Sequence, residues 1–294
     1  MKKGRVLIIG RPNVGKSTFL NNVIGQKVAI TSPKPQTTRF PIKALFEDER
    51  GQIVFTDTPG IFGRAKDFLS KKINEKTLRA VNEEFDAVIY MVDHSRRRDF
   101  EEAKVLGIVR KINCPKILVI NKIDIEDKTY LPQYKFMEDE FPHFFYISSL
   151  KIQHIKPLIE KIFDLLPSPS TNPINFEIES ANAAGYPLLN IDSRNFISEL
   201  IREKVFLMMG EEIPYTTAVI VDEIKERNDK LTYIKARILT TATRYKKMLI
   251  GEDGRKIKEI GSYARKEIAL AINKKVYLDL KVETDPHWQE TFYS

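Results

Sequence analysis

Cysteine is almost absent from the sequence, since Cys114 is the only one among 294 residues. One cysteine cannot close an intrachain disulfide, which is typical of proteins in a reducing compartment. Long apolar runs are also absent, because none approaches the roughly 18 residues that a membrane-spanning helix needs. No signal peptide is visible before the first predicted strand, and the four histidines lack the spacing of metal ligands. We therefore expect a cytoplasmic protein without a transition metal, in which Cys114 is a small packing residue.

The basic charge of the chain is confined to one segment. The formal net charge is +8, and residues 225–275 contain 15 lysines and arginines against 6 acidic residues. The remainder of the chain is nearly neutral. A solvated helix face is the plainest interpretation of a charged run, but an excess of this size favours a polyanionic partner. Nucleic acid is our first candidate and an anionic membrane surface is the second.

Apolar runs alternate with amphipathic stretches over the first 166 residues. The alternation predicts an α/β fold with a mainly parallel sheet that is covered on both faces. The expected strands cover residues 6–9, 53–56, 87–92, 117–120 and 144–147, and the expected helices cover 16–24, 67–82, 100–111, 131–140 and 153–165. Functional loops of such a sheet lie at the carboxyl ends of its strands. Four of the five runs are followed there by a residue that can act on a ligand, namely Gly10, Asp57, Asn121 and Ser148.

The alternating pattern stops where a segment rich in proline and serine predicts a linker. We interpret residues 167–191 as an irregular connection between a first domain, 1–166, and a second domain, 192–294. The second domain begins with a helical rhythm that Gly210 ends as a C-cap. Two strand-like runs, a helix and a final strand at 276–282 follow.

Residues 10–17 match the phosphate-binding pattern G-x-x-x-x-G-K-[ST] between a predicted strand and a predicted helix. Glycines let the backbone wrap a phosphate chain, and the helix N-terminus adds positive potential. Lys16 is expected to reach the terminal phosphates, and the Ser17 hydroxyl to ligate Mg²⁺. The expected phosphate-binding residues are Gly10, Arg11, Pro12, Asn13, Val14, Gly15, Lys16, Ser17 and Thr18.

The second predicted strand ends in groups that suit Mg²⁺ and a γ-phosphate. The carboxylate of Asp57 can hold the ion through water, and the N–H of Gly60 can contact the phosphate. The residues at this strand end are Asp57, Thr58, Pro59 and Gly60.

The fourth predicted strand ends in Asn121, Lys122 and, two residues later, Asp124. A carboxylate at Asp124 accepts two N–H bonds from guanine, whereas adenine would leave it desolvated and unpaired. The Lys122 stem can lie over the base, and Asn121 can tie this loop to residues 10–17. The three motifs in this order predict GTP or GDP with Mg²⁺ as the ligands.

These residues resemble those of the translation-factor-like GTPases. The resemblance implies that residues 36–39 form the first switch, in which we favour Thr38 over Thr37 as the Mg²⁺ ligand. It also implies that the backbone of Ser148 and Ser149 contacts guanine.

Ile61 stands where Ras-like proteins carry the glutamine that orients the attacking water. Isoleucine cannot hydrogen-bond water, so we expect slow hydrolysis in which Lys16, Thr38 and Gly60 act with another group. In related GTPases that lack the glutamine, an asparagine at the position of Asn13 ligates K⁺ beside the phosphates. The alternative is that Asn13 only stabilises its own turn.

A G-x-x-G turn at residues 251–254 lies in the basic segment, before an amphipathic helix. Such a turn between two helices is the backbone clamp of KH domains. The surrounding sequence, after a GTPase domain, closely resembles the Era family of bacterial GTPases over nearly the whole chain. That resemblance implies an α+β type II KH domain that binds the 3′ end of 16S rRNA, and a role in small-subunit assembly. The expected RNA-binding residues are Lys246, Lys247, Gly251, Gly254, Arg255, Lys256, Lys258 and Arg265.

The turn departs from the family in its two inner residues, since Glu252 and Asp253 are both acidic. Because carboxylates repel phosphate, we expect weaker and more salt-sensitive RNA binding. Trp288 and Tyr293 either stack on bases or, as is commoner for such residues, pack against the domain. Two other functions stay open, an RNA-binding protein with a vestigial nucleotide site and a GTPase with peripheral contact to the inner membrane face. We expect a monomer.

Overall fold

The computed structural model describes residues 1–61, 67–167, 192–228 and 230–293, with side chains up to residue 290. Contacts divide the chain into two units, each with its own sheet. The first unit contains residues 1–31 and 38–190, and the second contains residues 32–37 and 191–294. The irregular connection expected at 167–191 lies, beyond residue 167, outside the described residues.

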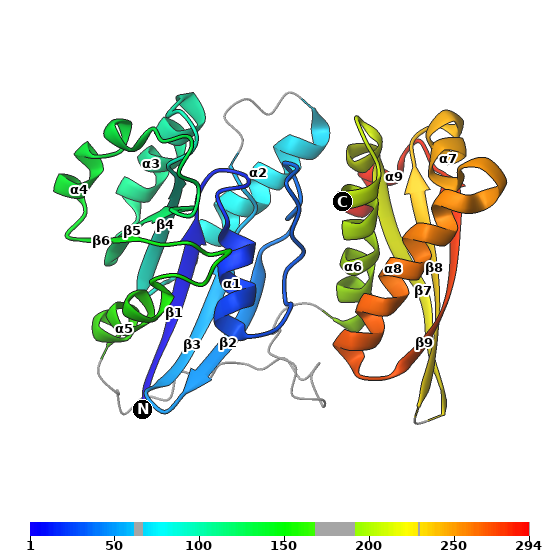
Figure 1. Ribbon diagram of the computed structural model, residues 1–294, viewed down its shortest axis with the longest axis horizontal. Helices are drawn as coiled ribbons and strands as arrows, with labels where there is room; N and C mark the ends of the chain where they lie inside the picture. The colour runs from blue at the N-terminus through cyan, green and yellow to red at the C-terminus, as the bar shows by residue number, and fades with distance from the viewer. Residues whose placement is uncertain (62–66, 168–191, 229, 294) are drawn as a thin grey trace. The chain divides into compact units, whose positions relative to one another are not determined.

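Six strands form the sheet of the first unit, shown in Figure 1: β1 (Lys2–Ile9), β2 (Ile42–Asp48), β3 (Gly51–Asp57), β4 (Ala87–Asp93), β5 (Lys116–Asn121) and β6 (His143–Tyr146). Their order is β2-β3-β1-β4-β5-β6. All neighbours pair in parallel except β2 and β3. A parallel strand covered on both faces is apolar along its length, and every residue of β4 is buried. The predicted mainly parallel sheet is confirmed, and the carboxyl ends of its parallel strands lie on the same side of the unit.

Strand β2 was not predicted from the sequence. It pairs antiparallel with β3 at the edge of the sheet, and several of its residues are partly or fully exposed. An edge strand that is only half buried lacks the continuous apolar run by which the other five strands were recognised.

Helices cover both faces of this sheet (Figure 1): α1 (Lys16–Ile24), α2 (Phe68–Val81), α3 (Phe100–Lys111), α4 (Phe136–Glu140) and α5 (Ile155–Leu165). The Asp99 carboxylate caps α3 by accepting from the N–H groups of Glu101 and Glu102. The single long helix expected at 131–140 is instead a 3₁₀ turn, Leu131–Gln133, followed by the short α4. Cys114 packs against the core, as expected.

The second unit contains α6 (Ser193–Met208), β7 (Thr217–Asn228), β8 (Leu231–Thr240), α7 (Thr243–Ile250), α8 (Arg255–Ile272), β9 (Lys275–Thr284) and α9 (Trp288–Tyr293). Its sheet has the order β7-β8-β9, with β7 antiparallel and β9 parallel to β8. This order of helices and strands is the one expected of a type II KH domain. Among the described residues, none of the helices combines the length and the apolar character that a membrane crossing requires.

Candidate functional site

The P-loop, residues 10–17, joins the end of β1 to the start of α1. Gly15 has a φ of 105°, and a Cβ at that position would lie 2.1 Å from Nδ2 of Asn121. Only glycine adopts such a backbone in such a space. The buried ammonium of Lys16 donates to the carbonyl oxygens of Gly10 and Arg11, at 3.1 and 2.9 Å. The loop is therefore closed tightly around the Lys16 side chain.

The electrostatics of the site suit an anion together with a cation. Burial lowers the pKa of Lys16 to about 8, although the Asp57 charge opposes the shift. Burial also raises the pKa of Asp57 to about 6, against the effects of Lys16 and of a hydrogen bond from Ser17. Phosphate would stabilise the charged form of Lys16, and a divalent cation would stabilise the charged form of Asp57.

Three predicted magnesium ligands, Ser17, Thr38 and Asp57, lie together. Ser17 Oγ donates to Asp57 Oδ2 at 2.6 Å and lies 3.1 Å from Thr38 Oγ1. Asp57 Oδ1 is buried and has no hydrogen-bond partner among the described residues, a need that a metal-bound water would satisfy. The Thr37 hydroxyl instead donates to the carbonyl of Lys34 at 2.6 Å. The oxygen donors fit Mg²⁺, and the geometry favours Thr38 over Thr37.

Gly60 lies directly against the P-loop. A Cβ at Gly60 would lie 2.4 Å from the backbone nitrogen of Pro12. The Thr58 hydroxyl donates to the carbonyl of Ile8 at 2.8 Å and fixes the end of β3 to β1. Ile61 is only 1% exposed and belongs to the core. Its side chain is therefore unable to hold a water at the nucleotide, as the sequence predicts.

Asn121 connects the predicted base-recognition loop to the P-loop. Its amide donates to the carbonyl of Val14 at 2.7 Å and accepts from the N–H of Ser149 at 2.9 Å. The Ser148 hydroxyl donates to the Asp124 carboxylate. The structure thus brings together Asn121, Asp124, Ser148 and Ser149, which the sequence predicts to surround guanine.

Two residues at the end of β4 support this loop and were missed in the sequence. Asp93 forms an ion pair with the Lys122 ammonium at 2.6 Å. Nε2 of His94 lies 2.9 Å from the carbonyl oxygen of Lys122. A signal for Asp93 was present, because it follows the predicted strand 87–92, the one strand end to which no role was assigned.

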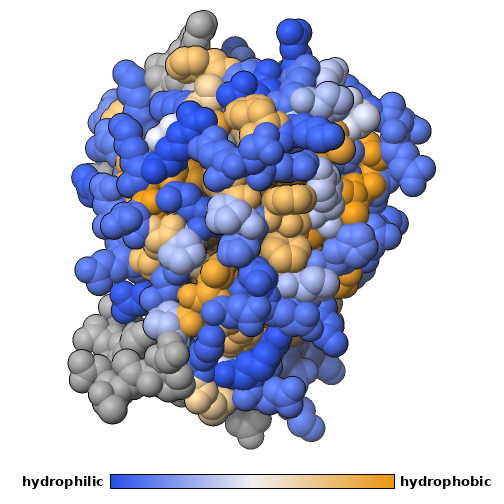
Figure 2. Space-filling model, turned by 90° about the vertical axis from the view of Figure 1, so that its left-hand side faces the viewer, coloured by the Kyte–Doolittle hydropathy of each residue, from blue (hydrophilic) through white to orange (hydrophobic). Residues whose placement is uncertain are grey.

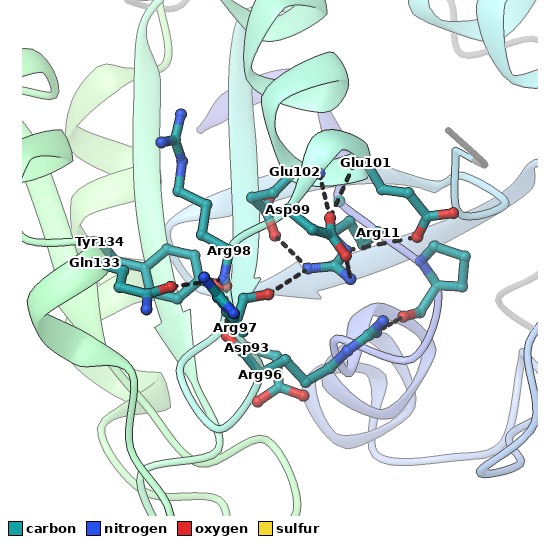
Figure 3. A network of polar contacts seen from close by, with 12 residues as sticks. Arg11, Asp93, Arg96, Arg97, Arg98, Asp99, Glu101, Glu102, Gln133 and Tyr134 are labelled. Carbon is teal, nitrogen blue, oxygen red and sulfur yellow. Dashed lines mark hydrogen bonds and ion pairs between the residues drawn. The ribbon is translucent and has the colours of Figure 1, made fainter. Parts of the chain in front are cut away.

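The side chain of Arg11 extends from the P-loop into a polar network around the start of α3 (Figure 3). Its guanidinium lies 2.7 Å from the Asp99 carboxylate, 3.7 Å from Glu101 and 3.6 Å from Glu102. The Tyr90 hydroxyl donates to Glu102 at 2.5 Å. Burial is the main reason that the pKa of Glu102 lies above its usual value. Arg11 therefore anchors the P-loop to α3, a role that the sequence motif did not predict.

In the second unit, the G-x-x-G turn joins α7 to α8. Gly251 has a φ of 70°, and a Cβ there would lie 2.8 Å from the Cβ of Lys256. Glu252 and Asp253 are both exposed, and an Asp253 carboxylate oxygen lies 3.9 Å from the Arg255 guanidinium. The turn combines an accessible backbone with two solvent-facing carboxylates.

The basic residues predicted to bind RNA flank this turn on α7 and α8 and differ in exposure. Lys256 is half-buried and pairs with Glu259 at 3.0 Å. Lys246 is also half-buried, whereas the exposed members are Lys247, Arg255, Lys258 and Arg265.

Of the two aromatic residues in the tail, Trp288 packs against its own unit. It is 1% exposed, and its indole N–H donates to the carbonyl of Thr216 at 3.0 Å. Base stacking by Trp288 is therefore wrong and the packing alternative is confirmed. The Tyr293 side chain lies outside the described part of the structure.

Comparisons with known proteins match both parts of the chain. Residues 5–122 match a family model described as 50S ribosome-binding GTPase, and residues 212–289 match a KH domain model. The GTPase Era of Halothermothrix orenii is 39% identical over 293 residues, covering 98% of this chain and 95% of the relative. The chain belongs to the Era family of GTPases. GTP hydrolysis is the activity of this family.

Solved Era structures match the whole chain. An Era variant from Aquifex aeolicus bound to GDP·AlF4⁻ has a TM-score of 0.87 and 34% identity, covering 100% of this chain and 97% of that one. An Era structure with MgGDPNP and nucleotides 1506–1542 of 16S ribosomal RNA has a TM-score of 0.86 at the same identity. Both solved structures thus contain a guanine nucleotide, and the second also contains Mg²⁺.

Proposed function

We propose that this Era GTPase is a GTP-hydrolysing switch that binds 16S rRNA near its 3′ end and assists assembly of the small ribosomal subunit. The observation that carries the proposal is the presence, in one chain, of the clustered Ser17, Thr38 and Asp57 and of an open G-x-x-G turn. The Era structure that contains both MgGDPNP and 16S rRNA nucleotides supports it.

In the proposed mechanism, the P-loop N–H groups cradle the phosphates and Lys16 contacts the terminal ones. Ser17, Thr38 and Asp57 hold Mg²⁺, which when bound neutralises charge on the phosphates. Thr38 and the N–H of Gly60 contact the γ-phosphate and lose that contact after hydrolysis, which releases the switch segments.

The guanine base is proposed to bind at the opposite end of the nucleotide. Asp124 accepts from the base edge, and the Ser148 hydroxyl orients its carboxylate. The Lys122 stem, positioned by Asp93, covers the base. The backbone of Ser148 and Ser149 contacts guanine, and Asn121 keeps this loop against the P-loop.

The switch is tested by measuring the affinity for a 16S 3′-end RNA fragment with GDPNP and with GDP. A switch requires that RNA bind the GDPNP state and the GDP state with different affinities. We therefore expect the two RNA affinities to differ about fivefold or more. Lys16→Ala serves as the control, since a chain that cannot engage the phosphates should lose the difference. Equal RNA affinities in the two nucleotide states would argue against a switch.

We further propose that Asn13 holds K⁺ beside the phosphates, because Ile61 is buried in the core and cannot orient water. Exchanging KCl for NaCl is then expected to slow GTP hydrolysis about tenfold or more, since one positive charge is lost from the transition state. Phosphate release is the measurement. Asn13→Ala should hydrolyse GTP at the same rate in KCl and in NaCl. If this variant is still faster in KCl, Asn13 does not bind K⁺ and only stabilises its own turn.

For RNA, we propose that the backbone of Gly251 and Gly254 clamps the strand and that the flanking lysines and arginines bind phosphates. Neutralising the exposed acidic pair with Glu252→Gln and Asp253→Asn is expected to strengthen RNA binding about tenfold at low salt. Fluorescence anisotropy over a KCl series measures the gain, which should shrink as salt rises. The matched control is Glu223→Gln with Glu226→Gln on β7, and a gain of equal size there would refute a local effect.

Residues 1–166 and 192–294 are the proposed boundaries of the GTPase and KH domains. We also propose a monomer in the cytoplasm, with any membrane contact weak and peripheral. Sedimentation with anionic liposomes tests the membrane alternative. If liposomes and RNA do not compete for the chain, the basic segment does not serve as a membrane-binding surface.

A further inference from the structure

A hollow in the surface of the GTPase unit carries exposed aromatic and basic side chains. It has a volume of about 450 Å³ and lies where α3 begins and faces the turn before α4. Arg97, Arg98, Phe100, Gln133 and Phe136 line it. Figure 2 shows the side of this unit that carries α4 and β6, where hydrophobic residues interrupt a mostly hydrophilic surface. We call this hollow the α3–α4 pocket.

Two phenyl rings of the α3–α4 pocket face solvent to an unusual degree. Phe100 is 65% exposed and Phe136 is 42% exposed. The guanidinium carbon of Arg98 lies 4.7 Å from the centroid of the Phe136 ring, so one ring is already stacked on a cation. The ring of Phe100 remains accessible for stacking with a flat ligand.

The charge in the pocket is positive. The Asp99 carboxylate is committed to Arg11 at 2.7 Å and to the N-cap of α3. The Arg97 side chain is exposed and Arg98 is half-buried, and within the described residues neither guanidinium forms an ion pair. Two guanidinium groups thus remain for an anion, and Arg is the side chain best suited to phosphate.

A polar group that can recognise a base edge lies beside these cations. Gln133 accepts from the backbone N–H of Arg98 at 3.0 Å through Oε1 (Figure 3). This bond leaves the amide NH₂ of Gln133 as a donor at the edge of the pocket. The pocket thus offers an aromatic ring for a base, guanidinium groups for a phosphate and an amide donor for the base edge. These are the groups that bind a nucleotide.

We propose that the α3–α4 pocket binds an unpaired nucleotide of RNA, as a contact of the GTPase unit that is separate from the G-x-x-G turn. The base stacks on Phe100, the phosphate binds Arg97 and Arg98, and the Gln133 amide donates to the base. The proposal takes its RNA from the proposed function, but it does not depend on the turn at 251–254.

The pocket is tested in the full chain with Gly254→Asp, which weakens the proposed KH clamp. Binding of a labelled single-stranded 12-nucleotide RNA is measured with GDPNP present. Phe100→Ala is expected to weaken the remaining binding about fivefold or more, since stacking on one aromatic ring contributes that much. Arg97→Ala is also expected to weaken it, because a phosphate contact is lost. Phe100→Trp should restore it. Ultraviolet crosslinks from the parent chain should map to residues 97–104 and 131–140.

Controls are Phe144→Ala on β6, an exposed ring outside the pocket (42% exposed, against 65% for Phe100), and Lys111→Ala, an exposed cation on α3. Both should bind the RNA like the parent. Unchanged RNA binding by the pocket variants, together with crosslinks elsewhere, would overturn the proposal. The proposal would also be overturned if the pocket variants bound RNA normally but no longer bound an acidic protein of the small subunit. Failure of the proposed function has a different signature, because Gly254→Asp alone would then leave the affinity for the 16S 3′ fragment unchanged.

Discussion

Replacing Asp124 by asparagine is expected to lower GTP affinity by about 10²- to 10³-fold and to make xanthosine triphosphate the preferred nucleotide. The carboxylate accepts two N–H bonds from guanine, and its removal leaves those donors unpaired in a desolvated site. The new amide NH₂ instead donates to the additional carbonyl of xanthine. Competition binding of the two nucleotides at fixed Mg²⁺ measures the exchange of preference.

Ser148→Ala is the matched control for this substitution. It removes the hydroxyl that donates to the Asp124 carboxylate but keeps the carboxylate itself. GTP affinity should fall modestly, with guanine still preferred over xanthine. An Asp124→Asn chain that retained its guanine preference would show that this carboxylate does not touch the base.

Replacing Arg11 by methionine is expected to lower the free energy of unfolding by about 3 kcal/mol, because it leaves Glu102 buried without its cationic partner. Glu102 is 0% exposed and already has a pKa that burial raises. Protonation would remove the unpaired charge, so the difference between variant and parent should be largest near neutral pH and smaller near pH 5. Urea unfolding at the two pH values measures both effects.

Arg110→Met on α3 is the control for Arg11→Met. Arg110 pairs with Glu140 at 2.7 Å, but its side chain is 54% exposed, and an exposed pair contributes about 0–1 kcal/mol. Similar losses in the two variants would mean that burial of the Arg11 network does not set its energy. A loss for Arg11→Met that is independent of pH would remove Glu102 from the explanation.

The sequence alone could predict the parallel sheet and most of the nucleotide site, because the motifs at 10–17, 57–60 and 121–124 are short and follow buried strands. The sequence supported only a preference for Thr38 over Thr37 as the Mg²⁺ ligand. Adjacent side chains point in different directions, and only the contacts in the structure show which hydroxyl lies beside Ser17. The Arg11 network was not predictable, because Glu102 and Tyr90 reach Arg11 only through the packing of α3 against β4. Asp93 was overlooked although the strand-end rule includes it.

The close approach of Gly60 to Pro12 also limits how this chain can change over evolution. Every L-amino acid other than glycine would place a Cβ 2.4 to 2.6 Å from atoms of Pro12, two of which belong to the backbone. A substitution at position 60 therefore depends on the residue at position 12, because any larger side chain at 60 requires the P-loop backbone to move. Gly107 and Gly210 have no atom within 4 Å of such a Cβ. In this structure a side chain at either of those two positions meets no such clash, whereas one at position 60 does.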